Sequence, residues 1–577
     1  MRRKAPATLL FIFLSLLVFV FSSLYYSRHV ISSHIIITFL PLNLTTLPIS
    51  HSANNAIPEQ FLDLTRHTAH VQPIPTSPPP SSTAQEYSSV QHFTALLLPG
   101  WEVLLAIPPL LFPPSHNYTC LFRKNETSPA KFVGVSPSTK LELFKCDVPP
   151  GNRRRVVYQP VFTRSSDKSY PVNPNSPVLP KWSFLVYDSF SSENDVLLFV
   201  KGLNNRQGTN RSPSEFNCIF WVETRNNITV KTAVTSSIQE VFRCPRPNLK
   251  ALSSGGRDER IRTSIEIKEK NAVVPSVAYY TPKRTIVSPG RKKQLCACTM
   301  VYNVAKFLRE WVMYHAKIGV EKFILYDNES DDDLEDVVKK LKLEGYNIET
   351  VFWIWPKTQE AGFSHAVIHA KNSCTWIMYI DIDEFVFSPS WQSRSKPSDQ
   401  LIKSLLPRGK ERRKVGQVSL KCNDFGPSNQ KSHPPEGVTQ GYTCRRRVEK
   451  RHKSIVLLEA VEHSLYNAIH HFGLKSGYRS KEMSREGAVV NHYKYQAWSE
   501  FKTKFRRRVS AYVVDWTRAV NLRSNDRTPG LGFEAVEPKG WANKFCEVKD
   551  ERLKLLARKW FGISGKLEGS RRMAWQK

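Results

Sequence analysis

The feature that most constrains this chain is an alternation of strand-like and helix-like segments between Leu295 and Ile380. We expect strands at Leu295–Val301, Lys322–Tyr326, Ile348–Trp353 and Thr375–Ile380. Helical spacing of apolar residues predicts a helix in each interval between them. Strands joined by helices of this length form right-handed crossovers, so we predict a mostly parallel sheet with helices on both faces. Ligands bind such sheets beyond the carboxyl ends of the strands.

Carboxylates stand at two of these strand ends. Asp327 follows the second strand, and Asp381 and Asp383 follow the fourth, whose last five residues are all apolar. Alternation along an extended strand predicts that Asp381 and Asp383 share a face while Ile382 turns into the core. Two neighbouring carboxylates at a buried strand end repel each other, and a divalent cation would relieve that cost. The alternative is a solvated acidic turn, and Asp327 also fits a helix-capping turn.

The N-terminus predicts a membrane anchor. A basic tetrad, Met1–Lys4, precedes an apolar run from Ala5 to about Tyr26. A run of about 20 apolar residues can cross a bilayer as a helix, and its basic flank stays cytoplasmic. We therefore expect a single-pass type II protein whose remaining chain lies in a lumen. A cleaved signal peptide, with Ser22 and Ser23 near the cleavage site, is the alternative.

A lumenal chain is expected to carry glycosylation acceptors and paired cysteines. Acceptor sequons stand at Asn43, Asn117, Asn125, Asn210, Asn227 and Asn328. The chain has 10 cysteines, an even number. Cys120 and Cys146 are spaced like Cys218 and Cys244 and have similar flanks, which predicts two similar strand pairs, each with its own disulfide, unless the spacing is coincidental. Cys296 and Cys298, on a probable strand, are expected to be core or disulfide residues.

The rest of the N-terminal half predicts a β-rich, sandwich-like domain. Short strand-like runs broken by turn residues occur at Thr94–Leu98, Val103–Ile107, Trp182–Tyr187, Val196–Val200 and Cys218–Val222. A chain of 577 residues is longer than one hydrophobic core usually organises. We predict an anchor at 1–28, a stem at 29–91, a β-rich accessory domain at 92–247, a linker at 248–293 and an α/β catalytic domain at 294–577.

An ordered set of motifs then resembles a known family. It comprises Cys296–Cys298, Tyr326–Ser330, Tyr379–Phe385, Phe425–Ser428, Gly441–Arg445, Arg451–Ile455, His470–Phe472 and Asn491–Tyr493. Together they resemble glycosyltransferase family 92 in its plant form, over about Leu295 to Trp516. The resemblance implies a GT-A fold (Rossmann-like), dependence on Mn²⁺ or alternatively Mg²⁺, and an inverting reaction. Plant members with an assigned role elongate the β-1,4-galactan side chains of pectin from UDP-galactose, and some carry an N-terminal carbohydrate-binding β domain.

The resemblance also implies roles for individual residues. Nucleotide-sugar binding is expected of Val301, Tyr302, Asp327, Asp381, Arg445 and Lys453, and metal binding of Asp381, Asp383 and His492. An inverting transfer needs a base to deprotonate the acceptor hydroxyl. Our candidate is Asp424, with Glu384 and Glu459 as competitors. Asn328 lies inside the expected nucleotide site, so we expect it to carry no glycan. The segment Gln359–His365 departs from other branches of the family and leaves the acceptor open.

Three functional classes remain to be compared. Lys and Arg exceed Asp and Glu by enough to give a formal net charge of +32, which favours polyanionic partners. A nucleic-acid binder would not explain an anchor, sequons and paired cysteines, and no nucleic-acid module is visible. A catalytically inactive lumenal carbohydrate-binding or assembly partner would not need the metal carboxylates. We therefore expect a Golgi glycosyltransferase with an acidic pectin acceptor; another nucleotide-sugar donor and a homo-oligomer remain open.

Overall fold

The computed structural model describes the following residues: 93–109, 117–137, 139–154, 156–165, 176–192, 194–204, 209–222, 229–248, 260–281, 290–449, 451–506, 529–531, 535–564 and 571–576. All of these residues belong to one compact unit. The predicted anchor at 1–28 and stem at 29–91 lie outside the described residues. Within the described ranges, no helix combines the length and apolar character that a membrane span requires.

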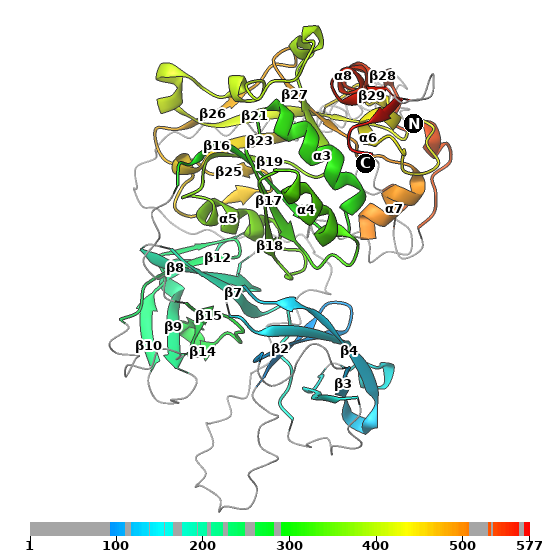
Figure 1. The fold of residues 1–577 in the computed structure, drawn as a ribbon. Helices are drawn as coiled ribbons and strands as arrows, with labels where there is room; N and C mark the ends of the chain where they lie inside the picture. The colour runs from blue at the N-terminus through cyan, green and yellow to red at the C-terminus, as the bar shows by residue number, and fades with distance from the viewer. Residues whose placement is uncertain are drawn as a thin grey trace, which may run out of the picture. The chain divides into compact units, whose positions relative to one another are not determined.

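The C-terminal half is built on one large sheet (Figure 1). Its strands are β16 (Lys293–Val301), β17 (Lys322–Asp327), β18 (Ile348–Phe352), β19 (Cys374–Tyr379), β20 (Glu384–Phe387), β21 (Val415–Asp424), β23 (His452–Leu457), β26 (Arg479–Glu482) and β27 (Val489–His492). Their order is β18-β17-β16-β19-β23-β21-β27-β20, with β26 beside β21. The first four strands predicted from the sequence are therefore all present and adjacent.

Only part of this sheet is parallel. Strands β18, β17, β16 and β19 run parallel. Beyond them, β23 is antiparallel to both β19 and β21, and β20 is antiparallel to β27. Strand β21 is parallel to both β26 and β27, so five of the eight pairings described for this sheet are parallel, and the predicted mostly parallel sheet holds for the sheet as a whole. The antiparallel pairings begin at β19, where the alternation of strands and helices ends.

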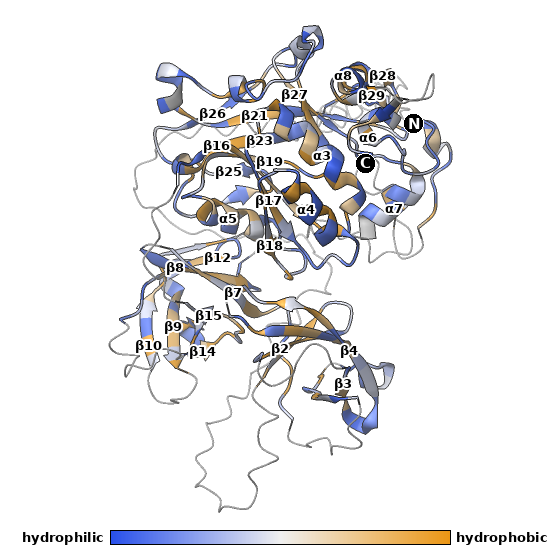
Figure 2. Ribbon diagram, in the orientation of Figure 1, coloured by the Kyte–Doolittle hydropathy of each residue, from blue (hydrophilic) through white to orange (hydrophobic). Residues whose placement is uncertain are grey.

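Helices cover both faces of the parallel half. They are α3 (Ala305–Ile318), α4 (Leu334–Leu343) and α5 (Gln359–His369). Buried residues of α3 and α4 pack with Ala297 and Phe323 on one face, whereas Phe363 of α5 packs with Cys298 and Ile324 on the other. Figure 2 shows α3 and α4 as part hydrophobic and part hydrophilic, as expected for helices that lie between a sheet and solvent.

The N-terminal half of the described chain contains three antiparallel sheets. The strands are β1 (Thr94–Leu98), β2 (Glu102–Ile107), β3 (Tyr118–Leu121), β4 (Thr127–Val135), β5 (Glu142–Asp147), β6 (Val161–Arg164), β7 (Leu185–Ser191), β8 (Asp195–Lys201), β9 (Phe216–Val222), β10 (Thr229–Ala233), β11 (Ser236–Ile238), β12 (Val241–Pro245), β13 (Ile261–Ile267), β14 (Ala272–Val273) and β15 (Tyr279–Tyr280). Phe242 of β12 packs against Phe216 of β9, with ring centroids 5.4 Å apart in one buried cluster, so these two sheets form a sandwich. Strands β13 to β15 lie in the range 248–293 that we predicted to be linker, and β13 pairs with β9.

The repeated cysteine spacing marks two disulfides. Cys120 bonds to Cys146, and Cys218 bonds to Cys244, as the spacing predicts. The interpretation as paired strands is wrong, however. The first disulfide links β3 to β5, which are separated by β4, and the second links β9 to β12, which belong to different sheets. Cys296 bonds to Cys374, and Cys298 is a buried free thiol.

The β-rich region and the catalytic half share one hydrophobic core. Leu143 and Phe199 of the β-rich region are buried in the same cluster as Tyr326 and Ile324 of the central sheet. The rings of Trp182 and Trp355 stack with their centroids 5.7 Å apart. Because this cluster contains side chains from both halves, the described residues form one folded body with a β-rich and an α/β part.

Shorter elements complete the C-terminal part. They are β22 (Cys444–Arg445), β24 (Asn467–Ala468), β25 (His471–Phe472), β28 (Val548–Lys549), β29 (Gly562–Ser564), β30 (Arg571–Met573), α6 (Val438–Gly441), α7 (Trp498–Arg506) and α8 (Arg552–Phe561). Cys546 bonds to Cys444, the Phe545 ring stacks on Tyr495, and Trp541 is buried beside them. These contacts pack the segment around Trp541 against the catalytic part.

Candidate active site

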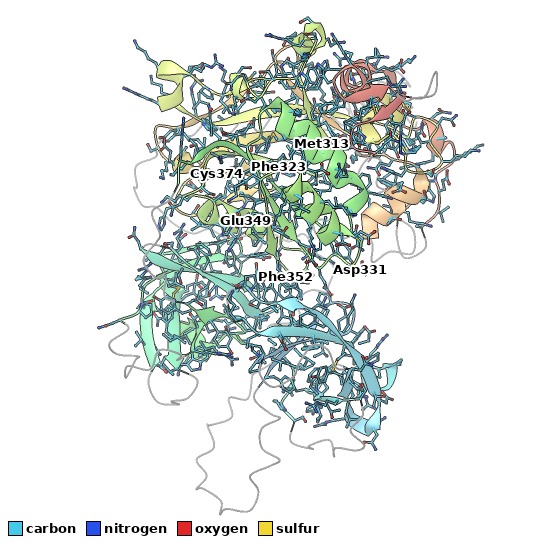
Figure 3. The ribbon with its side chains drawn as sticks, in the orientation of Figure 1. Met313, Phe323, Asp331, Glu349, Phe352 and Cys374 are labelled. Atoms are coloured by element: carbon cyan, nitrogen blue, oxygen red, sulfur yellow. A yellow bond between two sulfur atoms is a disulfide. The ribbon has the colours of Figure 1, made fainter. Side chains whose placement is uncertain are left out.

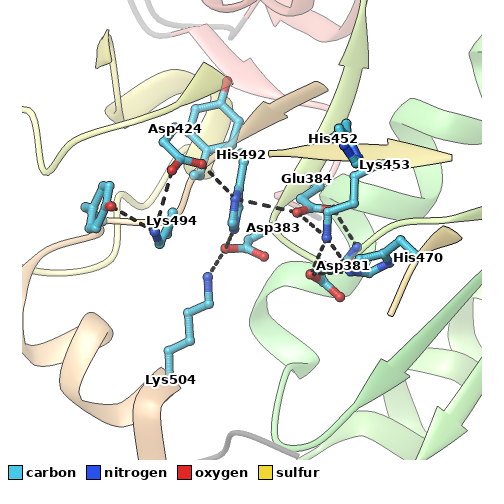
Figure 4. Close-up of polar contacts among 12 residues, drawn as sticks. Asp381, Asp383, Glu384, Asp424, His452, Lys453, His470, His492, Lys494 and Lys504 are labelled. Atoms are coloured by element: carbon cyan, nitrogen blue, oxygen red, sulfur yellow. Dashed lines mark hydrogen bonds and ion pairs between the residues drawn. The ribbon is translucent and has the colours of Figure 1, made fainter. Parts of the chain in front are cut away.

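Strand register brings the candidate residues to one edge of the sheet. His492 of β27 pairs with Glu384 of β20 on one side and with Asp424 of β21 on the other. Tyr379, the last residue of β19, pairs with Ser454 near the start of β23, which places Lys453 beside the segment that follows β19. Figure 4 shows the resulting cluster of acids, histidines and lysines.

One part of the cluster is built around the buried Lys453. Its Nζ lies 2.8 Å from Asp381 Oδ2 and 2.8 Å from Glu384 Oε1. Burial alone would lower the pKa of Lys453, but these two carboxylates hold it above its ordinary value. Burial alone would raise the pKa of Asp381, but the charges of Lys453 and His470 hold it below its ordinary value. Lys453 therefore stays charged, and Asp381 stays ionised.

The other part is centred on His492. Its Nε2 lies 3.6 Å from Asp383 Oδ2, and its Nδ1 lies 3.1 Å from Asp424 Oδ1. Lys494 Nζ lies 3.5 Å from the second oxygen of Asp424. Although burial opposes ionisation, the bond from His492 and the charge of Lys494 hold the pKa of Asp424 below its ordinary value. Lys504 of α7 contacts Asp383 from the open side of the cluster (Figure 4).

Asp381 and Asp383 do not project side by side from a strand. Strand β19 ends at Tyr379, and residues 381–383 form a turn in which the Glu384 backbone N–H donates to Asp381 O at 3.1 Å. The side chain of Glu384 accepts the Asp381 N–H at 2.8 Å. In a turn the alternation of an extended strand does not apply, so Asp381 reaches Lys453 while Asp383 reaches His492. The predicted common face is wrong, whereas the predicted burial of Ile382 is confirmed.

Asp383 and His492 suit a divalent metal. Both are buried, and their facing atoms are close enough to bind one ion at about 2.1 Å each. Asp424 Oδ1 is hydrogen-bonded to the other ring nitrogen of His492, Nδ1. A carboxylate in this position commonly orients a metal-binding imidazole. Across the described ranges, no three His, Cys, Asp or Glu side chains are grouped to hold an ion. The predicted third ligand, Asp381, binds Lys453 instead.

The predicted nucleoside contacts lie at the ends of β16 and β17. Asp327 ends β17, and its Oδ1 accepts the Ser330 N–H at 3.0 Å, so it does cap the following turn. Burial raises the pKa of Asp327. The side chain of Val301 is buried in the core, which leaves only its backbone to face a ligand. Tyr302 follows it and is half-buried.

Three other candidates are paired, buried or remote from the cluster. Arg445, expected to bind the nucleotide sugar, lies with Nε 2.7 Å from Asp550 Oδ2, so its charge is already paired. Glu384 has no exposed surface and cannot reach an acceptor hydroxyl. Glu459 is exposed just beyond Leu457, at the end of β23 opposite Lys453. Neither competitor is placed to act as the base.

Sequence reasoning gave no role to His470, Lys494 or Lys504. His470 Nε2 lies 2.6 Å from Lys453 Nζ. The family motifs include His470, but the chain pattern alone does not show that β25 folds back beside β23. Lys494 lies two positions after His492. That spacing would have suggested Lys494 as a site residue if β27, which ends at His492, had been predicted.

The side chain of the sequon residue Asn328 forms hydrogen bonds within the fold. Its Nδ2 donates to Trp353 O at 2.6 Å and to Trp355 O at 3.2 Å. A glycan on this nitrogen would replace one of its two hydrogens and so remove at least one of these bonds, and we therefore predict that Asn328 is unmodified. Glycopeptide mass spectrometry of the purified full-length chain checks this, with the exposed sequon Asn125 as the occupied control. A glycan found on Asn328 would contradict the placement of the nucleotide loop.

The fold and the cluster define a class of protein. The parallel half of the sheet is covered by helices. Ionised carboxylates and a pair of side chains suited to a metal lie where its parallel strands end. This arrangement is typical of an α/β enzyme with a ligand site at that end of the sheet.

Comparison with known proteins gives the family. The profile of glycosyltransferase family 92 matches residues 291–521. A family 92 protein of Oryza sativa subsp. japonica is 36% identical over 491 residues, which cover 82% of this chain and 80% of that protein. One of Arabidopsis thaliana is 42% identical over 381 residues, covering 65% of this chain and 66% of that protein. The chain belongs to glycosyltransferase family 92, and it is a glycosyltransferase.

Solved structures are more distant. The mannosyltransferase PcManGT from Pyrobaculum calidifontis, in complex with GDP-Man and Mn²⁺, is 12% identical and has a TM-score of 0.23, with 39% of this chain and 65% of that chain covered. A similarity at that level does not bear on donor, metal or acceptor.

Proposed function

We propose that this enzyme is a metal-dependent, inverting hexosyltransferase of the GT-A type that transfers galactose from UDP-galactose in β-1,4 linkage to the galactan side chains of pectin. The observation that carries the proposal is the pairing of Asp383 with His492 Nε2, while Asp424 contacts the other ring nitrogen of His492. Asp383 and His492 would hold Mn²⁺ or Mg²⁺. The ion would neutralise charge on the nucleotide diphosphate as the sugar leaves.

The chain's own residues provide the remaining parts of the site. Asp327 and the backbone at Val301 would contact the nucleoside, since both lie at the ends of neighbouring parallel strands. Lys453 keeps Asp381 ionised, which suits Asp381 to accept bonds from ribose hydroxyls. Donor identity and acceptor identity come from the family resemblance, and the net charge of +32 supports an acidic polymer.

We place the enzyme in the Golgi membrane as a single-pass type II protein with a lumenal catalytic domain. The apolar run that follows Met1–Lys4 supports the anchor. The disulfides Cys120–Cys146, Cys218–Cys244, Cys296–Cys374 and Cys444–Cys546 support an oxidising compartment.

A donor screen tests the proposed reaction. Purified full-length chain is incubated with a panel of nucleotide sugars and β-1,4-galactan oligosaccharides, with Mn²⁺, with Mg²⁺ or with EDTA. We expect chain extension from UDP-galactose with Mn²⁺ and none with EDTA, and linkage analysis should give β-1,4 bonds. Extension that prefers another nucleotide sugar, or that EDTA does not reduce, would refute the donor or the metal requirement.

A further inference from the structure

The loop that carries the nucleoside contact is held on one side by the catalytic part. This donor loop, Asp327–Asp333, joins β17 to α4. The Asn303 backbone N–H donates to Ser330 Oγ at 3.0 Å, and Asn303 Oδ1 accepts the Asp331 N–H at 2.8 Å. These bonds fix the half of the loop nearest α3.

The β-rich region holds the other side of the donor loop. Lys145 of β5 forms an ion pair with Glu329, two residues after Asp327. Alternation along β5 places Phe144 and Cys146 in the core of the β-rich region, whereas Leu143 and Lys145 face the catalytic part. Leu143 lies in the shared core, so the strand that presents Lys145 is fixed to the catalytic sheet.

This ion pair is sheltered from solvent. The side chain of Lys145 is 12% exposed and that of Glu329 is 22% exposed. Burial raises the pKa of Glu329, and the charge of Lys145 opposes that rise. A second contact to the loop, Lys131 with Asp331, spans 4.0 Å with side chains 64% and 54% exposed, so solvent screens it. Figure 3 shows Asp331 and Phe352 at the border with the β-rich region.

Glu329 sits at a constrained point of the loop. Its φ is 66°, in the left-handed region that few residues other than glycine adopt. The next residue, Ser330, donates its N–H to Asp327 Oδ1. The backbone turn at Glu329 therefore sets the orientation of the Asp327 carboxylate, and a partner that fixes Glu329 also fixes Asp327.

We propose that Lys145 is a positioning residue for the nucleotide-sugar donor, so that the β-rich region completes the donor site of the catalytic part. The inference rests on the proposed function, because it requires the donor to contact Asp327. An ion pair that only joined the two parts would change stability and leave donor affinity unaltered. The shared core already joins them, so the two roles can be separated by measurement.

The test compares Lys145→Met with Lys131→Met in the full-length chain. For Lys145→Met we expect KM for UDP-galactose and Kd for UDP, measured by calorimetry with Mn²⁺, to rise about 5- to 10-fold, in the usual range of coupling between sites. The kcat should stay within about twofold, because no group at the reacting centre changes. Lys131→Met, whose partner is exposed, should match the wild type.

Two further variants establish the mechanism. Lys145→Arg keeps the charge and should restore Kd for UDP to within about twofold of the wild type. Glu329→Gln should raise Kd as much as Lys145→Met does, and the double variant should be no worse than either, as expected when both act through one contact. An unchanged Kd for Lys145→Met, or a loss of stability with no change in Kd, overturns the positioning role. Wild-type chain that does not bind UDP overturns the proposed function as well.

Discussion

Asp383→Ala is expected to reduce transfer by about 10³-fold at saturating donor and acceptor. A bound metal contributes several kcal/mol to stabilising the transferred charge, and each ~1.4 kcal/mol is a factor of ten in rate. Asp383 is the carboxylate that faces His492 Nε2, at 3.6 Å, and it is 3% exposed. Its loss removes the pair that we propose holds the ion.

The fold should survive this substitution. Asp383 leaves two partners behind: Lys504, whose side chain is 38% exposed and can be solvated by water, and His492, whose other ring nitrogen keeps its bond to Asp424. Sugar-transfer rates across a Mn²⁺ titration measure the first effect, and thermal unfolding measures the second. Asp399→Ala, at a site where the carboxylate is 68% exposed, is the matched control and should leave both unchanged. Activity of Asp383→Ala within tenfold of the wild type would remove the proposed metal role.

How far the sequence predicts the fold depends on how local the signal is. The parallel half follows from apolar periodicity, since each strand and helix between Lys293 and Tyr379 carries its own pattern. The part of the sheet beyond β19 does not, because the antiparallel pairing of β19 with β23 and the parallel pairing of β21 with β27 join distant segments. The repeated cysteine spacing predicts which cysteines bond but not which sheets they link.

The site shows the same division. Asp327 and Asp383 are found from the sequence because Asp327 directly follows a predicted strand and Asp383 belongs to the Asp-Ile-Asp triplet that follows another. His492 comes only from the family motif, since nothing near it in the chain indicates that β27 lies between β20 and β21. The turn at 381–383 is missed because an apolar strand followed by Asp-Ile-Asp reads equally well as a longer strand. Lys453 was expected to bind the nucleotide sugar, but its burial against two carboxylates depends on long-range pairing.

Asp424 is the residue whose role the structure reopens. We predicted it to be the base that deprotonates the acceptor, yet both its oxygens have cationic or hydrogen-bonding partners and it is 4% exposed. A general base works best with a pKa near the working pH, whereas the contacts of Asp424 hold its pKa below the ordinary value. Its position behind His492 Nδ1 suits a carboxylate that orients a metal-binding imidazole.

Asp424→Asn separates these two roles. An orienting carboxylate predicts that Mn²⁺ affinity falls about 10- to 100-fold, because the amide no longer fixes the charge and tautomer of His492. Saturating Mn²⁺ should then restore most of kcat. A base instead predicts a kcat about 10²–10⁴-fold lower that added Mn²⁺ does not restore, with metal affinity unchanged. Mn²⁺ binding measured by electron paramagnetic resonance, together with kcat at saturating Mn²⁺, distinguishes the two. The contacts of His492 with Asp424 and Asp383 lead us to expect the first result.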